Sequence, residues 1–169
     1  IILCHDDIEI KMPPINFISI LSILKNKKYG FIGPAGTAEL GGDCVWWDKD
    51  RWAEGKHRGK VFHIDPEDKI YTSEYGPYGQ VIVLDGLFLA CRAELLQEII
   101  LDKPPVYKGE WDFYDLYYTL QSHDAGYENH AVPIELVHHS RGELTGRDSW
   151  HLNRGSFITA NLERFPIAC

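Results

Sequence analysis

Runs of apolar and β-branched residues alternate along the chain with stretches of helical period, and this alternation restricts the fold more than any other feature. The segment 80–92, QVIVLDGLFLACR, predicts a buried strand. The segments 13–30 and 112–126 each place apolar side chains on one helical face. Strands that alternate with helices are typical of the α/β class, so we predict a mixed sheet flanked by helices.

The first predicted helix follows Pro14, which suits a first turn, and ends before Gly30. Its predicted apolar face consists of Ile15, Ile18, Leu21, Ile23 and Leu24. Residues 34–66 are rich in glycine, tryptophan and charge, and predict a long surface excursion with short strands. Further strands are expected at 29–33, 69–76 and 130–139, and further helices at 93–101 and near 157–165.

Length and charge restrict the class of protein. A chain of 169 residues suits one domain, and a net charge of -8 argues against nucleic acid as a partner. No apolar stretch approaches the roughly 20 residues that cross a bilayer, so we expect a soluble, cytoplasmic protein with four free cysteine thiols. Residue 1 stands inside a predicted strand, which favours a fragment of a longer domain.

An apolar strand ends in His5, Asp6 and Asp7 near the start of the chain. Crowded carboxylates beside an imidazole are typical of a cation site, and Mn²⁺ tolerates imidazole better than Mg²⁺ does. If the strand continues, His5 and Asp7 point the same way and Asp6 faces the other side. A solvated turn is the alternative for this motif.

A second acidic group lies at the start of the helix predicted over 112–126. Asp112 and Asp115 are three residues apart, as in a capping arrangement, among the aromatic residues Trp111, Phe113 and Tyr114. A carboxylate in the first helical turn is held ionised by the helix dipole, which suits a general base at neutral pH. Asp112 could therefore cap the helix while Asp115 reacts.

Two further motifs follow apolar strands. His138 and His139 precede Ser140 and Arg141, a pattern that fits a metal ligand beside a phosphate contact, or a hydrogen-bonded strand end. Asp85 and Gly86 interrupt an apolar run, where the glycine either forms a bulge or lets a ligand approach the backbone.

The order of these motifs resembles that of GT-A glycosyltransferases, specifically the carboxyl-terminal half of family 2-like domains of the streptomycin-biosynthesis type. The resemblance is carried from residue 1 to about residue 143 by five segments, CHDDIEI, GFIGPAG with VWWD, DGLFLACR, FYDLYYTLQSHDAGY and IELVHHSRGE. It implies a GT-A-like mixed sheet whose amino-terminal strands are missing. It also implies one domain over 1–169, with a core at 1–143 and a lid and helix at 144–169.

The resemblance implies an inverting transfer of sugar from a nucleotide-diphosphate sugar to a saccharide or other hydroxyl acceptor, with Mn²⁺ or Mg²⁺ as cofactor. Asp115 matches the base that deprotonates the acceptor. His5, Asp7 and His139 match the metal ligands, with His138 a weaker match than His139. The residues assigned to the substrates are Asp6, Trp47, Asp85, Gly86, Tyr114, His138 and Arg141.

Other readings of the sequence remain open. Trp46 and Trp47 fit either a platform for a sugar ring or core packing. The chain as a whole also fits a non-catalytic carbohydrate-binding or assembly module that keeps a GT-A-like half, or, less well, a metal-dependent phosphohydrolase that uses the His5–Asp7 turn. An unpaired edge of a truncated sheet would offer a route to a homodimer.

Overall fold

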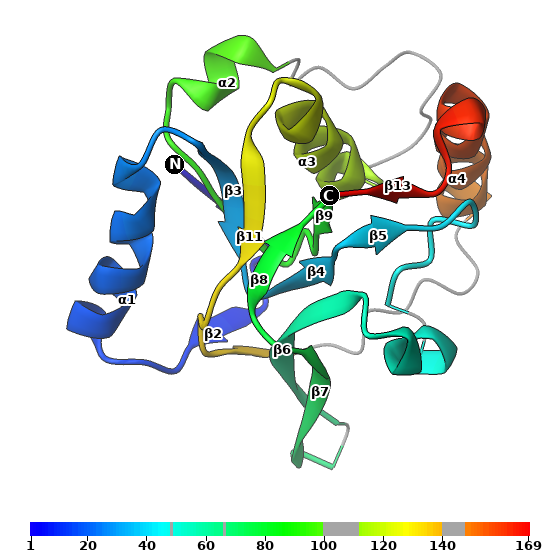
Figure 1. Ribbon diagram of the computed structural model, residues 1–169. Helices are drawn as coiled ribbons and strands as arrows, with labels where there is room; N and C mark the ends of the chain where they lie inside the picture. Colours follow the sequence, from blue (N-terminus) through cyan, green and yellow to red (C-terminus); the bar gives the residue numbers. More distant parts are fainter. Residues whose placement is uncertain (48, 66, 100–111, 140–147) are drawn as a thin grey trace.

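The computed structural model describes residues 1–47, 49–65, 67–99, 112–139 and 148–169. Within these residues the chain forms two larger sheets and one two-stranded sheet, with helices packed around them (Figure 1). Parallel and antiparallel pairs occur in both larger sheets. The predicted α/β class, with mixed sheets flanked by helices, is confirmed.

The first sheet forms the centre of the hydrophobic core. Its strand order is β1 (Ile2–Cys4), β10 (Phe88–Ala90), β3 (Tyr29–Gly33), β11 (Glu128–Ala131) and β8 (Gly79–Val81). Phe31 and Ile32 are neighbours on β3, and both are fully buried, yet they belong to two separate hydrophobic clusters. Successive side chains point to opposite faces of a strand, so both faces of this sheet are covered.

The second sheet carries the strands that end in the sequence motifs. Its order is β2 (Ile8–Ile10), β12 (Leu136–His138), β6 (His57–Ile64), β4 (Ala35–Thr37) and β9 (Val83–Leu84), and β7 (Ile70–Gly76) also pairs with β6. Strand β12 runs antiparallel to β2 and parallel to β6. This arrangement brings the beginning and the end of the motif-bearing sequence together.

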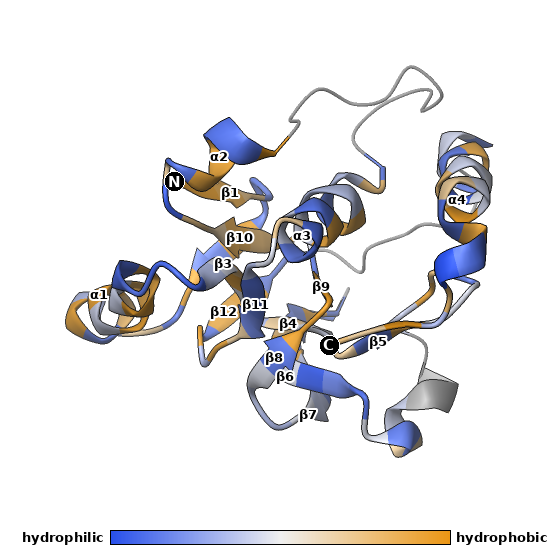
Figure 2. Cartoon of the chain, turned by 45° about the horizontal axis from the view of Figure 1, so that its top comes forward, coloured by the Kyte–Doolittle hydropathy of each residue, from blue (hydrophilic) through white to orange (hydrophobic). Residues whose placement is uncertain are grey.

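The helices lie around these sheets. They are α1 (Pro14–Leu21), η1 (Ser22–Lys25), η2 (Lys49–Glu54), α2 (Leu95–Glu98), α3 (Tyr114–Asp124), α4 (Asp148–Asn161) and η3 (Leu162–Arg164). Figure 2 shows the hydrophobic strand β10 between α1 and α3 in that view. The predicted helix over 112–126 is confirmed as α3, whereas the last helix begins at Asp148, earlier than the sequence indicates.

Helix α1 forms as predicted, but only part of its predicted apolar face packs against the core. Ile15 is 71% exposed and Ile18 is 61% exposed, so the prediction that they are packed is wrong. The side chains against the core are Phe17, Ile20, Leu21, Ile23 and Leu24. The chain has isoleucine or leucine on nearly every side of this helix, so the period alone does not select which side is buried.

The segment 80–92 is divided among three short strands instead of forming the single predicted strand. β8 pairs with β11 of the first sheet, β9 pairs with β4 of the second, and β10 returns to pair with β1 and β3. The turn at Asp85, Gly86 and Leu87 lies between β9 and β10. The apolar composition reflects burial on both sheets, and the change of sheet bends the chain.

Asn129 connects three elements from within the core. The side chain is 1% exposed, and its Oδ1 accepts a hydrogen bond from Phe31 N at 3.0 Å. Its Nδ2 donates to Thr119 O at 2.7 Å and to Ile82 O at 3.0 Å. A single amide thus holds β3, α3 and the chain between β8 and β9 against β11.

We expect Asn129→Leu to lower the free energy of unfolding by about 3 to 5 kcal/mol, because it leaves three buried backbone groups without their partner. Urea unfolding followed by tryptophan fluorescence measures this change. The matched control is Asn26→Leu, which removes an exposed side-chain bond to Lys28 N and should cost less than about 1 kcal/mol. Equal effects at the two positions would contradict the structural role of Asn129.

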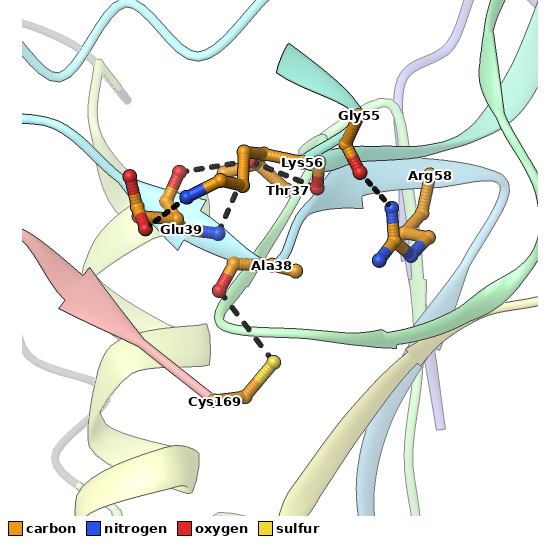
Figure 3. Close-up of polar contacts among 7 residues, drawn as sticks. All are labelled: Thr37, Ala38, Glu39, Gly55, Lys56, Arg58 and Cys169. Carbon is orange, nitrogen blue, oxygen red and sulfur yellow. Dashed lines mark hydrogen bonds and ion pairs between the residues drawn. The ribbon is translucent and has the colours of Figure 1, made fainter.

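The carboxyl terminus packs onto the β4–β5 corner. β13 (Ile167–Ala168) pairs antiparallel with β5 (Glu39–Leu40). As Figure 3 shows, the Cys169 thiol donates to Ala38 O at 3.5 Å, beside the Lys56–Glu39 ion pair. The residues after α4 are therefore part of the same packed unit as β4 and β5. The predicted division into a core and a lid stays a prediction.

Two simpler expectations concern cysteines and membranes. All four cysteines are free, as predicted. Among the described residues, no helix combines the length and apolar character that a membrane span requires. The homodimer and the cytoplasmic location remain predictions.

Candidate metal centre and active site

Three ionisable side chains gather where β1, β2 and β12 meet. His5 follows β1, Asp7 precedes β2, and His138 ends β12. The β12–β2 pairing sets His138 opposite Ile8, and His139 N donates to Asp7 O at 2.8 Å. One ligand atom from each of His5, Asp7 and His138 lies within 4.8 Å of the others. We call these three residues the HDH cluster.

The HDH cluster has the chemistry of a divalent-cation site. His138 Nε2 lies 3.3 Å from Asp7 Oδ2, and His5 Nδ1 lies 3.7 Å from Asp7 Oδ1. Within the part of the chain that the structure describes, Asp7 Oδ1 is buried and accepts no hydrogen bond, which leaves its lone pairs for a cation. Two imidazole nitrogens and one carboxylate suit Mn²⁺ better than Mg²⁺, which prefers oxygen ligands alone. The residues present fit such an ion.

Burial also favours the neutral form of the His138 side chain. It lowers the pKa of this side chain, and the nearby carboxylates of Asp7 and Asp85 offset that shift only in part. The neutral imidazole is the form that binds a metal ion. The His138 ring contacts His5 on one side, with ring centroids 5.6 Å apart.

The structure places His138, and not His139, in the cluster. His139 lies on the other face of the strand, where its Nε2 is 3.5 Å from Glu9 Oε2 and its side chain is 44% exposed. Alternate residues of an extended chain face opposite sides, so only one of two adjacent histidines can join His5 and Asp7. The geometry thus differs from the sequence prediction, which assigned His139 to the metal and His138 to the substrate.

A turn connects the HDH cluster to the start of α3. His5 N donates to Leu87 O at 3.1 Å, and Leu87 N donates to Asp85 Oδ1 at 3.0 Å. On the other side of the turn, Gly86 N donates to Asp115 Oδ2 at 3.1 Å. Residues 85–87 therefore lie between the HDH cluster and Asp115, in one neighbourhood of the molecule.

Gly86 is required by the close approach of α3. A Cβ atom at this position would lie 2.5 Å from Tyr114 Oη and 3.0 Å from Asp115 Cβ. The Tyr114 hydroxyl donates to Gly86 O at 2.5 Å. The structure thus shows a role beside the two that the sequence leaves open for this glycine, which is close packing against Tyr114 and Asp115.

The environment of Asp115 raises its pKa to about 7, chiefly because burial removes solvent from the carboxylate. The negative charge of Asp85 raises it further, and the N–H groups of Leu116 and Gly86 oppose the shift. We predict from the sequence that the helix dipole keeps this carboxylate ionised, but burial has the larger effect. A carboxyl group with this pKa can accept a proton near neutral pH.

The sequence predicts that Asp112 caps α3, but this side chain contacts α4 instead. Its Oδ2 accepts a hydrogen bond from Ser149 Oγ of α4 at 2.8 Å. Phe113 stands at the N-cap of α3 with a positive φ of 66° and makes no side-chain cap hydrogen bond. Phe113 instead packs against Phe157 and Trp150, with ring centroids 5.7 and 5.6 Å away.

The remaining predicted substrate residues are dispersed. Asp6 is exposed in the turn between β1 and β2. Trp46 is 2% exposed in the core, and Trp47 is partly buried between Trp46 and Trp150. Core packing thus accounts for Trp46. Arg141 lies outside the described residues.

The charge of Asp85 affects two other ionisable groups, which the sequence does not indicate. Its charge acts on the pKa of His138 in the HDH cluster and on the pKa of Asp115 in α3.

His63, which no sequence motif indicates, stands opposite His138 in the parallel pair β12–β6. The sequence shows only that His63 alternates with the apolar residue Val61. It does not show that His63 lies beside His138, because the pairing of β6 with β12 joins residues more than 70 positions apart.

An α/β domain that gathers ionisable side chains at its strand ends has the architecture of a ligand-binding α/β domain. A sequence profile of the Glycosyltransferase like family matches residues 1–143, and the chain belongs to this family. No curated protein matches the chain. The family supports sugar transfer in general, between a donor and an acceptor. The streptomycin-biosynthesis type and the assignment to a carboxyl-terminal half stay predictions.

Proposed function

We propose that this chain carries out a metal-dependent, inverting transfer of sugar from a nucleotide-diphosphate sugar to an acceptor hydroxyl. The observation that carries the proposal is the connection of the HDH cluster to Asp115 through residues 85–87. Family membership supports sugar transfer, and this connection supports a donor diphosphate and an acceptor hydroxyl in adjacent positions.

His5, Asp7 and His138 would hold a divalent ion, which when bound supplies positive charge to the leaving diphosphate. Asp115 takes the proton of the acceptor hydroxyl at Oδ1, while Gly86 N holds Oδ2 by a hydrogen bond. One base that activates the acceptor for a single displacement leads to inversion at the sugar carbon. Asp85 lies in the same turn as Gly86, and its charge acts on His138 and Asp115, so its carboxylate would accept hydrogen bonds from substrate hydroxyl groups.

We expect hydrolysis of nucleotide-diphosphate sugars to require a divalent ion, with Mn²⁺ giving on the order of tenfold higher rates than Mg²⁺. The reason is the two imidazole ligands of the HDH cluster. Release of UDP and GDP from a panel of their sugar conjugates measures the rates, with EDTA-treated protein as the control. Equal rates without any added ion would contradict the metal dependence.

The same assay separates the alternatives. A non-catalytic carbohydrate-binding module would bind glycans but would show no metal-dependent binding of nucleoside diphosphates by calorimetry. A phosphohydrolase would release inorganic phosphate from simple phosphate esters. The connection of the cluster to Asp115 favours the transferase over both.

A further inference from the structure

A row of rings extends from the HDH cluster across the second sheet. His138 stands opposite His63 in the parallel pair β12–β6, and His63 stands opposite Tyr71 in the antiparallel pair β6–β7. The ring centroids of His138 and His63 are 5.7 Å apart. Those of His63 and Tyr71 are 5.0 Å apart, and the two planes are nearly parallel at 19°. The strand register therefore aligns three rings on one face of the sheet.

The row ends in an aromatic surface that solvent reaches. Tyr71 is 40% exposed on β7, the outer strand of the β6–β7 hairpin (Figure 1). One face of its ring is stacked on His63, so the exposed area belongs to the opposite face and the rim. A stacked aromatic ring is held in place at little further cost in entropy, which makes it a suitable contact surface for a ligand.

The row of rings connects this hairpin to the candidate metal site, because His138 belongs to the HDH cluster. Tyr75 alternates with Tyr71 on the same face of β7 and packs on Trp46 and Trp52, with ring centroids 5.3 and 4.9 Å away. Burial raises the pKa of Tyr75, and the charge of Asp85 raises it further. Asp85 also acts on the pKa of Asp115.

We propose that Tyr71, stacked on His63, forms a subsite for a pyranose ring of the acceptor saccharide. The proposal rests on the proposed function. It adds a binding site for a part of the acceptor that lies away from Asp115. A pyranose ring has one apolar face of C–H groups that stacks on an aromatic ring, and hydroxyl groups at its rim. Stacking on Tyr71 uses this apolar face and needs no charged partner, which favours a neutral saccharide at this position.

Saturation-transfer NMR tests the subsite with methyl α- and β-glycosides of glucose, galactose, mannose and N-acetylglucosamine, in the presence of Mn²⁺ and UDP. We expect at least one glycoside to bind and Tyr71→Ala to weaken its binding by about fivefold or more. Tyr71→Phe keeps the ring and should retain the binding. Ile70→Ala is the matched control, because Ile70 is an exposed neighbour on the opposite face of β7.

Three results would overturn the subsite. They are no binding of any glycoside by the unaltered chain, equal binding in Tyr71→Ala and Ile70→Ala, or a loss of UDP binding instead of glycoside binding, which would assign a nucleobase to Tyr71. Donor hydrolysis by the unaltered chain tests the proposed function separately. Glycoside binding that depends on Tyr71, without any hydrolysis, would reject the transferase and keep a saccharide site.

Discussion

Asp115→Asn is expected to reduce the rate of sugar transfer about 10²- to 10⁴-fold, because an amide cannot accept the proton of the acceptor hydroxyl. Asn can still accept the hydrogen bond from Gly86 N, so the first turn of α3 should keep its geometry. The measurement is the rate of UDP or GDP release in the presence of acceptor. An unchanged rate would reject Asp115 as the base.

The pH profile of the unaltered chain gives an independent test of the same group. The base must be ionised, so activity should rise with pH and reach half of its maximum near pH 7, where Asp115 titrates. Asp85→Asn removes a negative charge that raises this pKa, so it should move the rising limb to lower pH. A limb near pH 4 in the unaltered chain would contradict the buried environment of Asp115.

The same carboxyl group affects stability with a defined sign. The folded-state pKa, about 7, lies above the ordinary value of 3.8, so the contribution of Asp115 to stability is complete below pH 3.8 and is lost as pH rises through 7. At pH 8, Asp115→Asn should therefore raise the free energy of unfolding by about 1 to 2 kcal/mol, since partial solvation reduces the full effect. Asp124→Asn, at the exposed end of α3, is the control; its loss of the Arg164 ion pair should change stability by less than about 1 kcal/mol.

His138→Ala is expected to weaken Mn²⁺ binding by at least about 100-fold, because it removes one of three ligands from the HDH cluster. Calorimetric titration with Mn²⁺ measures the affinity, and donor hydrolysis should fall with it. His139→Ala is the matched control, since His139 contacts Glu9 on the opposite face, and it should change the affinity less than about twofold.

Asp7→Asn keeps the shape of the side chain and removes its charge, so it separates loss of the ligand from misfolding. We expect it to weaken Mn²⁺ binding as His138→Ala does, with an unchanged circular dichroism spectrum. Loss of Mn²⁺ binding in His139→Ala, with retention in His138→Ala, would reverse the assignment of the two histidines.

Local patterns in the sequence predict much of the fold. The period of residues 112–126 predicts α3, and Pro14 predicts the start of α1, because both signals depend on neighbours within one or two helical turns. The division of segment 80–92 among three strands could not be predicted from the local pattern. Its apolar residues are the same whether the segment stays in one sheet or crosses between two. The local pattern also did not indicate that Ile15 and Ile18 of α1 are exposed.

The sequence by itself determined the kinds of side chain and their positions at strand ends, with Asp7 after the first strand, paired histidines after a later one and Asp115 at a helix start. Only the tertiary structure decided that His138 and not His139 faces Asp7, that burial outweighs the helix dipole at Asp115, and that Tyr71 continues the row of rings. The physical reason is distance along the chain. Strand register, burial and the fields of remote charges arise from contacts between residues that the sequence separates by dozens of positions, whereas periodicity reports only on near neighbours.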